Sequence, residues 1–133
     1  MARRGKRGRR GGGERPADTL DRARQLARDK LGVARLRPAQ EDALRALVDG
    51  RDTFAVLPTG YGKSLLYQTR ALMLERPTVV VSPLIALMSD QENAMRRRGL
   101  PVIRLDSTLR VDERRSAPER LARGGTLVVL TTP

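Results

Sequence analysis

The stretch Leu57–Gln68, "LPTGYGKSLLYQ", decides the fold because it joins an apolar segment to a helical one through two glycines. The segment before it, Thr53–Leu57 ("TFAVL"), is predicted as a buried strand, and Lys63–Leu74 is predicted as a helix. Gly60 and Gly62 let the backbone curl so that successive N–H groups face inward and can hold an anion. A strand, a glycine turn and a helix in this order predict a phosphate-binding loop.

The residue types in this loop suit a nucleoside triphosphate with Mg²⁺. Lys63 would place its charge at the β- and γ-phosphates, and the Ser64 hydroxyl would ligate Mg²⁺, so both are predicted to serve catalysis. The strict pattern G-x-x-x-x-G-K-[ST] needs a glycine where this chain has Leu57. The alternative is a plain strand–helix turn with a surface lysine. The predicted nucleotide contacts of the loop are Pro58, Thr59, Gly60, Tyr61, Gly62, Lys63 and Ser64.

Strands and helices alternate after this loop, and two helices precede it. The continuous β-branched runs between helices predict an α/β fold with parallel strands covered on both faces. The predicted strands are Thr78–Ser82, Val102–Leu105 and Thr126–Thr131. The predicted helices run from an N-cap at Asp18 to Gly32, from Pro38 to Gly50, from Ile85 to Arg98, and from Val111 to Arg123 with a break at Pro118.

Composition narrows the classes of function. The chain has 133 residues and a net charge of +12, which indicates a polyanionic partner. It has no Cys and no His, which excludes disulfides, thiolate or imidazole metal sites and histidine acid–base chemistry. No apolar run approaches the ~20 residues that span a bilayer, so we expect a cytoplasmic protein with no membrane partner.

The basic charge is concentrated at the N-terminus. Residues 1–13 carry six Arg or Lys residues and no acidic residue. We therefore expect residues 1–15 to form a basic disordered tail, and residues 16–133 to form the folded domain. The tail would add contacts to nucleic-acid phosphates, or would serve only as a solubilising segment.

Several stretches resemble the RecQ family of superfamily-two DNA helicases. "LPTGYGKSLLYQ" is similar to motif I of that family, which has the form P-T-G-x-G-K-S. "LRPAQEDAL" (Leu36–Leu44) resembles motif zero, F-R-P-x-Q, and "VVVSPLIALMSDQ" (Val79–Gln91) resembles motif Ia, V-V-S-P-L-x-S-L-M-x-D-Q. "LDSTL" (Leu105–Leu109) is similar to the segment L-N-S-T. "LTTP" (Leu130–Pro133) lies where the family has a strand ending in A-P-E or T-P-E.

The resemblance implies a RecA-like P-loop NTPase lobe with a parallel sheet, and an ATP- and Mg²⁺-dependent enzyme that unwinds DNA in the 3′ to 5′ direction. It implies that Gln40 reads the adenine edge with help from Arg37, and that an aromatic residue stacks on adenine where this chain has Val33. The partners implied are single-stranded and duplex DNA, bound by a monomer. The implied DNA contacts are Ser82, Pro83, Leu84, Ser107 and Thr108.

The family's motif II, D-E-x-H, has no counterpart in this sequence. The single Asp-Glu pair, Asp112-Glu113, lies in a polar helix with no apolar strand before it. We therefore expect the chain to be the N-terminal part of the first lobe, truncated before the motif II strand and inactive alone. In the family's strand order, two later strands separate Thr53–Leu57 from the motif Ia strand, so this segment is expected to lack its neighbours. The alternatives are a non-catalytic basic nucleic-acid-binding protein and a superfamily-two ATPase of DEAD/DEAH type outside RecQ.

Overall fold

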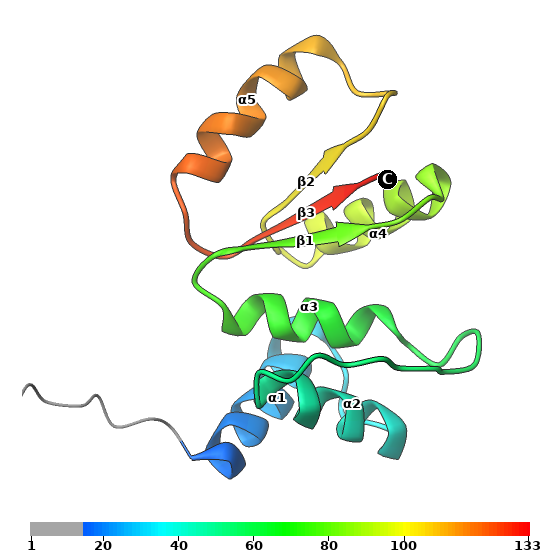
Figure 1. Ribbon diagram of the computed structural model, residues 1–133, viewed down its shortest axis with the longest axis vertical. Helices are drawn as coiled ribbons and strands as arrows, with labels where there is room; N and C mark the ends of the chain where they lie inside the picture. The colour runs from blue at the N-terminus through cyan, green and yellow to red at the C-terminus, as the bar shows by residue number, and fades with distance from the viewer. Residues whose placement is uncertain (1–14) are drawn as a thin grey trace, which may run out of the picture.

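The computed structural model describes residues 15–133 (Figure 1). The predicted tail, residues 1–15, lies outside the described residues apart from Arg15. Between residues 15 and 133, no helix combines the length and the apolar character that a bilayer crossing requires. The elements in chain order are α1 (Pro16–Leu31), α2 (Pro38–Val48), α3 (Ser64–Met73), β1 (Pro77–Val81), α4 (Ile85–Arg97), β2 (Val102–Leu105), α5 (Val111–Ala122) and β3 (Leu127–Thr131).

The three strands form one parallel sheet in the order β1-β3-β2. Val129 of β3 is in register with Val79 of β1 and with Ile103 of β2. The central strand β3 is buried along most of its length, as its continuous apolar sequence predicts. The predicted α/β fold with parallel strands is therefore confirmed.

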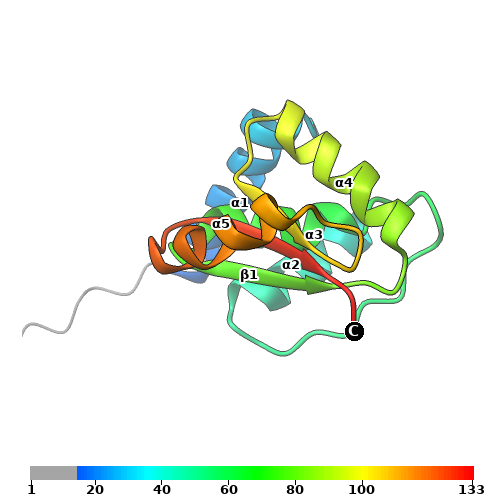
Figure 2. The same ribbon diagram turned by 90° about the horizontal axis from the view of Figure 1, so that it is seen from above.

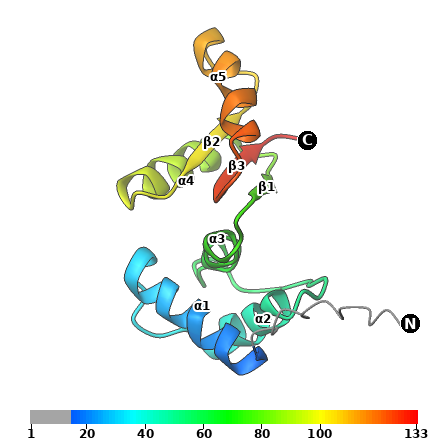
Figure 3. The same cartoon turned by 90° about the vertical axis from the view of Figure 1, so that its left-hand side faces the viewer.

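Helices cover the two faces of the sheet unequally. Val128 and Leu130 of β3 point toward α3 and α4, where they share a buried cluster with Leu65, Met88 and Met95. The alternate residues of β3, Leu127 and Val129, pack with Ile103 of β2 and Ala117 of α5. Figure 3 shows α3 lying between the sheet and the α1–α2 pair, and Figure 2 shows α4 beside the strands and α5 overlapping them in the view from above.

The edge strand β1 is covered on one face only. Val79 and Val81 are 62% and 60% exposed, and their register partners are Val129 and Thr131 of β3. This is the face on which α5 packs, but the α5 cluster contains residues of β2 and β3 and none of β1. The prediction that the strands are covered on both faces is therefore wrong for β1.

The prediction of a buried strand over Thr53–Leu57 is also wrong. The segment pairs with no strand among the described residues. Phe54 is 93% exposed and Val56 is 79% exposed, and only Leu57 is buried, at 8%, against α1, α2 and α3. An apolar segment becomes a strand only where a neighbour can take its N–H and C=O groups, and the sheet offers Thr53–Leu57 no such neighbour. The expectation that this segment lacks a sheet neighbour is confirmed.

The start of α1 and the continuity of α5 differ from prediction by more than an end residue. Helix α1 begins at Pro16, so Asp18 is not its N-cap but lies in the first turn, where it accepts a hydrogen bond from Arg15 Nε at 3.0 Å. Helix α5 runs through Pro118 without a break. A proline removes one backbone hydrogen bond, and the turns around it are held by the buried Ala117 and by Arg120, which donates to the Val102 carbonyl at 3.1 Å.

Candidate nucleotide site and strand-end loops

The loop before α3 has the backbone geometry of an anion cradle. Gly60 and Gly62 have φ angles of 78° and 88°, a region that favours glycine. A turn between Pro58 and Tyr61, whose N–H donates to the Pro58 carbonyl at 3.1 Å, brings the two glycines round to the start of α3. Among the described residues, the backbone N–H of Lys63 donates no hydrogen bond. This free donor at a helix N-terminus favours a bound anion.

Gln40 of α2 holds this loop through its side-chain amide. Its side-chain Nε2 donates to the Tyr61 carbonyl at 2.8 Å and to the Gly62 carbonyl at 3.2 Å. Its Oε1 accepts from the Arg37 backbone N–H at 2.9 Å, which caps α2. Gln40 is only 5% exposed, so all of its amide is used inside the protein. A Cβ on Gly62 would lie 2.6 Å from Gln40 Nε2, so a side chain at this position would displace the Gln40 amide from the two carbonyls.

Arg37 and Tyr61 join motif zero to the loop at a second point. The Arg37 guanidinium lies 4.7 Å from the centroid of the Tyr61 ring, within the range of a cation–π contact. Both side chains are thereby fixed beside the glycines. The exposed guanidinium of Arg37 remains accessible to a ligand on its other face.

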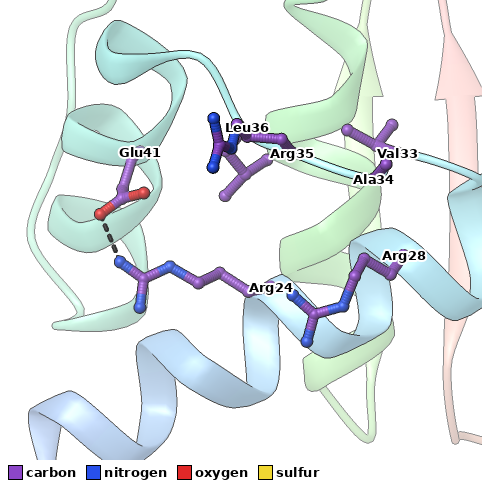
Figure 4. Close-up of a pocket in the computed structure, with 7 residues that line it drawn as sticks. All are labelled: Arg24, Arg28, Val33, Ala34, Arg35, Leu36 and Glu41. Atoms are coloured by element: carbon purple, nitrogen blue, oxygen red, sulfur yellow. Dashed lines mark hydrogen bonds and ion pairs between the residues drawn. The ribbon is translucent and has the colours of Figure 1, made fainter.

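Val33 lines a pocket of about 340 Å³ beside motif zero (Figure 4). The half-buried Val33 and Leu36 pack against the core and give the pocket an apolar wall. Arg24 and Arg28 reach into it from α1, and Arg24 forms an ion pair with Glu41 of α2. The valine therefore contributes a small apolar surface at the position where the resemblance implies an aromatic ring.

A cavity of about 370 Å³ opens above the phosphate loop. Its walls come from two parts of the chain, the loop with the start of α3, and one face of α4. Lys63 is exposed, and the structure pairs it with no acidic residue among residues 15–133. An unpaired ammonium beside a free N–H gives this cavity a positive potential. The lining residues are Thr59, Gly60, Gly62, Lys63, Ser64, Leu87 and Gln91.

The loops that follow β1 and β2 lie at one edge of the sheet, because both strands run parallel to β3 between them. Ser82 donates its backbone N–H to the Thr131 carbonyl at 2.9 Å, and its Oγ accepts from the Leu84 N–H at 3.3 Å. Pro83 and Leu84 are exposed. The structure thus brings the Ser82–Leu84 loop and the Ser107–Thr108 loop to the carboxyl edge of the sheet, where ligands of open α/β sheets bind.

Asp106 shapes the second of these loops. Its Oδ1 accepts from the Thr108 N–H at 2.7 Å and from the Thr108 hydroxyl, and its Oδ2 accepts from Arg104 Nη1 at 2.8 Å. Burial by itself raises the pKa of Asp106, but the Thr108 hydrogen bonds and the Arg104 charge outweigh it and lower the pKa. Arg104 also pairs with Glu92 of α4 at 3.0 Å. The Thr108 hydroxyl is therefore engaged within the loop, whereas Ser107 is exposed.

Comparison with known proteins identifies the family. The family model described as DEAD/DEAH box helicase matches residues 37–133. The chain belongs to the DEAD/DEAH box helicase family. The match begins at Arg37 and includes the phosphate loop and both strand-end loops. The predicted resemblance at the level of this helicase family is therefore confirmed.

The curated relatives of this helicase chain include several RecQ proteins. It is 41% identical over 90 residues to "ATP-dependent DNA helicase RecQ" of Bacillus subtilis. This match covers 67% of the chain and 15% of the relative. The proteins of the same name from Haemophilus influenzae and Synechocystis are 32% identical over 111 residues and 45% identical over 84 residues. These matches cover 84% and 63% of the chain, and 18% of each relative. The chain thus spans less than a fifth of these relatives, and they agree with the predicted RecQ resemblance.

The predicted nucleotide residues of this helicase chain gather around one loop, but sequence reasoning missed the α4 wall of the cavity. Gln91 stands in the motif Ia stretch and Tyr67 in the motif I stretch, and the two side chains are hydrogen-bonded. Gln91 follows Leu87 by four residues, and Tyr67 follows Lys63 by four. Residues four apart share a helix face, so this spacing is the sequence signal that could reveal the contact. The Arg104–Asp106 pair was also missed, because an alternating Arg and Asp in a strand end is typical of a solvated surface.

Proposed function

We propose that this chain is the nucleotide-binding part of a RecQ-type ATP-dependent DNA helicase. The observation that carries the proposal is the cavity above the phosphate loop, where the free N–H of Lys63, its unpaired ammonium and two glycines with positive φ converge. The family match and the RecQ relatives support ATP as the nucleotide and DNA as the substrate.

The residues of the loop fit a triphosphate with Mg²⁺. The backbone N–H groups of the loop would hold the inner phosphates, and the Lys63 ammonium would neutralise the outer ones. The Ser64 hydroxyl lines the cavity and has no hydrogen-bond partner among residues 15–133, so it is free to ligate Mg²⁺. The bound ion would withdraw charge from the phosphates, and the protein's part is to fix their position.

We assign the adenine to the Arg37 side of the loop. Arg37 offers an exposed guanidinium face, and Gln40 lies three residues further along α2. In the structure Gln40 Nε2 donates to the Tyr61 and Gly62 carbonyls and Oε1 accepts from the Arg37 N–H. Reading the adenine edge therefore requires Nε2 to donate to N7 of the base instead, and Oε1 to accept from N6. Base binding and loop geometry would then be linked through one side chain.

The strand-end loops are proposed to contact single-stranded DNA. Residues Ser82–Leu84 precede α4 at the carboxyl edge of the sheet, where Ser82 Oγ accepts from the Leu84 N–H and can donate its own O–H to a phosphate. Ser107 offers a second exposed hydroxyl at the same edge. Such contacts hold phosphates without reading bases. The proposed 3′ to 5′ unwinding activity belongs to the whole protein, and the 133-residue chain is expected to bind ATP and DNA without hydrolysing ATP, since its sequence has no D-E-x-H box.

A charge-matched pair of variants tests the proposal. Binding of a fluorescent ATP analogue with Mg²⁺ is measured for the unchanged chain, Lys63→Ala and Lys30→Ala, the control being an exposed lysine on α1. Loss of the Lys63 charge should weaken binding at least ~10-fold, because a hydrogen bond to a charged group contributes ~1.5–3 kcal/mol. Lys30→Ala should bind like the unchanged chain. Equal effects of the two variants would refute the phosphate-loop assignment.

A further inference from the structure

One face of α4 completes the phosphate cavity. Leu87 and Gln91 lie one turn apart on α4, and both line the cavity with Lys63 and Ser64. Residues four apart share a helix face, so α4 presents this pair together. The cavity therefore has two walls, the loop that binds the inner phosphates and a helix wall whose one polar group is the Gln91 amide.

A hydrogen bond from α3 sets the orientation of that amide. The Tyr67 hydroxyl donates to Gln91 Oε1, and Tyr67 lies one turn after Lys63 in the chain. Burial raises the pKa of Tyr67, so its hydroxyl keeps the proton and stays a donor at neutral pH. With Oε1 engaged, the Gln91 Nε2 group has no acceptor among the described residues, so both its N–H groups are available to a ligand.

We propose that Gln91 donates its side-chain amide to the terminal phosphate of the bound nucleoside triphosphate, and that Tyr67 is the positioning residue that holds the amide in place. This inference rests on the proposed function and adds to it a residue that distinguishes triphosphate from diphosphate. The loop N–H groups surround the inner phosphates. The other lining of the same cavity, formed by Leu87 and Gln91, is left for the phosphate that projects furthest from the loop.

The arrangement also connects the nucleotide to the strand-end loops. Helix α4 begins at Ile85, directly after Ser82–Leu84. Next to Gln91, Glu92 pairs with Arg104 at 3.0 Å, and Arg104 holds Asp106 at 2.8 Å. Loss of a terminal phosphate would therefore release a contact on the same helix that holds both proposed DNA-contacting loops.

The test compares two nucleotides on the full 133-residue chain. Dissociation constants with Mg²⁺ are measured by calorimetry for ADP and for a non-hydrolysable ATP analogue, with Gln91→Ala, Tyr67→Phe and the control Asn93→Ala, an exposed residue on α4. Gln91→Ala should weaken the triphosphate analogue about 10-fold and leave ADP within about two-fold, because only the last phosphate loses a donor. Tyr67→Phe should raise the ratio of the two dissociation constants, triphosphate analogue over ADP, by less than Gln91→Ala does. Asn93→Ala should leave this ratio unchanged.

A second variant distinguishes loss of the phosphate contact from disruption of the helix packing around Gln91. Gln91→Glu keeps the acceptor for the Tyr67 hydroxyl but places a negative charge against the phosphate, so it should weaken the triphosphate analogue more than Gln91→Ala does. Equal effects of the Gln91 variants on both nucleotides, or no effect, would overturn the terminal-phosphate contact while leaving Lys63-dependent binding intact. If the unchanged chain binds neither nucleotide, or if Lys63→Ala binds normally, the proposed function fails and this contact with it.

Discussion

The close approach of Gln40 to Gly62 predicts a sharp difference between two glycines of one loop. Gly60 and Gly62 both have positive φ, so alanine at either position costs ~1–2 kcal/mol of backbone strain. A Cβ on Gly60 meets no atom within 4 Å, whereas one on Gly62 lies 2.6 Å from Gln40 Nε2. The Gln40 amide would have to leave the Tyr61 and Gly62 carbonyls.

The two hydrogen bonds set the size of the difference. At ~0.5–1.5 kcal/mol each, their loss adds ~1–3 kcal/mol to the cost of Gly62→Ala over that of Gly60→Ala. The free energy of unfolding is measured by urea titration, followed by far-ultraviolet circular dichroism at low protein concentration. In a Gln40→Ala background the excess should disappear, because the side chain that collides is gone.

Two outcomes would contradict a role of Gln40 in this difference. Equal costs for Gly60→Ala and Gly62→Ala would show that the Gln40 contact does not constrain the loop. An excess that persists in the Gln40→Ala background would show that the cost of Gly62→Ala arises from its φ of 88° and not from the collision.

Three further predictions concern other parts of the molecule. The exposed Phe54–Val56 segment should exchange its amide hydrogens fast and promote aggregation, whereas Val128–Leu130 should exchange slowly; slow exchange at Phe54–Val56 in a soluble monomer would contradict the structure. Because its pKa is lowered in the folded state, ionised Asp106 should stabilise the fold above about pH 4, and this stabilisation should be lost as the pH falls through the folded-state pKa. The free energy of unfolding of Asp106→Asn should therefore fall less on acidification than that of the unchanged chain. Deleting residues 1–13 should flatten the slope of log affinity for single-stranded DNA against log salt, and an unchanged slope would exclude the tail as a DNA contact.

Local sequence signals predicted most of the α/β architecture. The aliphatic runs of β1, β2 and β3 and the glycine turn before α3 are determined by residues near one another in the chain, and they appear where the sequence places them. The segment Thr53–Leu57 has the same composition but is not a strand, because strand formation depends on a neighbour and not on the segment alone. Pro118 in the sequence predicts a helix break, yet packing of Ala117 keeps α5 continuous.

The candidate site is also predictable from the sequence only in part. The loop residues Gly60, Gly62 and Lys63 are contiguous, so a motif reveals them. The Gln40 contact with the loop spans 22 residues and the Tyr67–Gln91 contact spans 24, and no local pattern encodes either distance. These contacts follow from how α2 and α4 pack around α3, which only the folded structure shows.

The most direct measurement of the central claim is amide hydrogen exchange of the phosphate loop with and without an ATP analogue and Mg²⁺. Added nucleotide should slow exchange at Gly62, Lys63 and Ser64, whose N–H groups would donate to phosphate oxygens, and Lys63→Ala should weaken this protection. Nucleotide binding without slowed exchange at these residues, or with protection confined to the arginine-lined pocket around Val33, would contradict it.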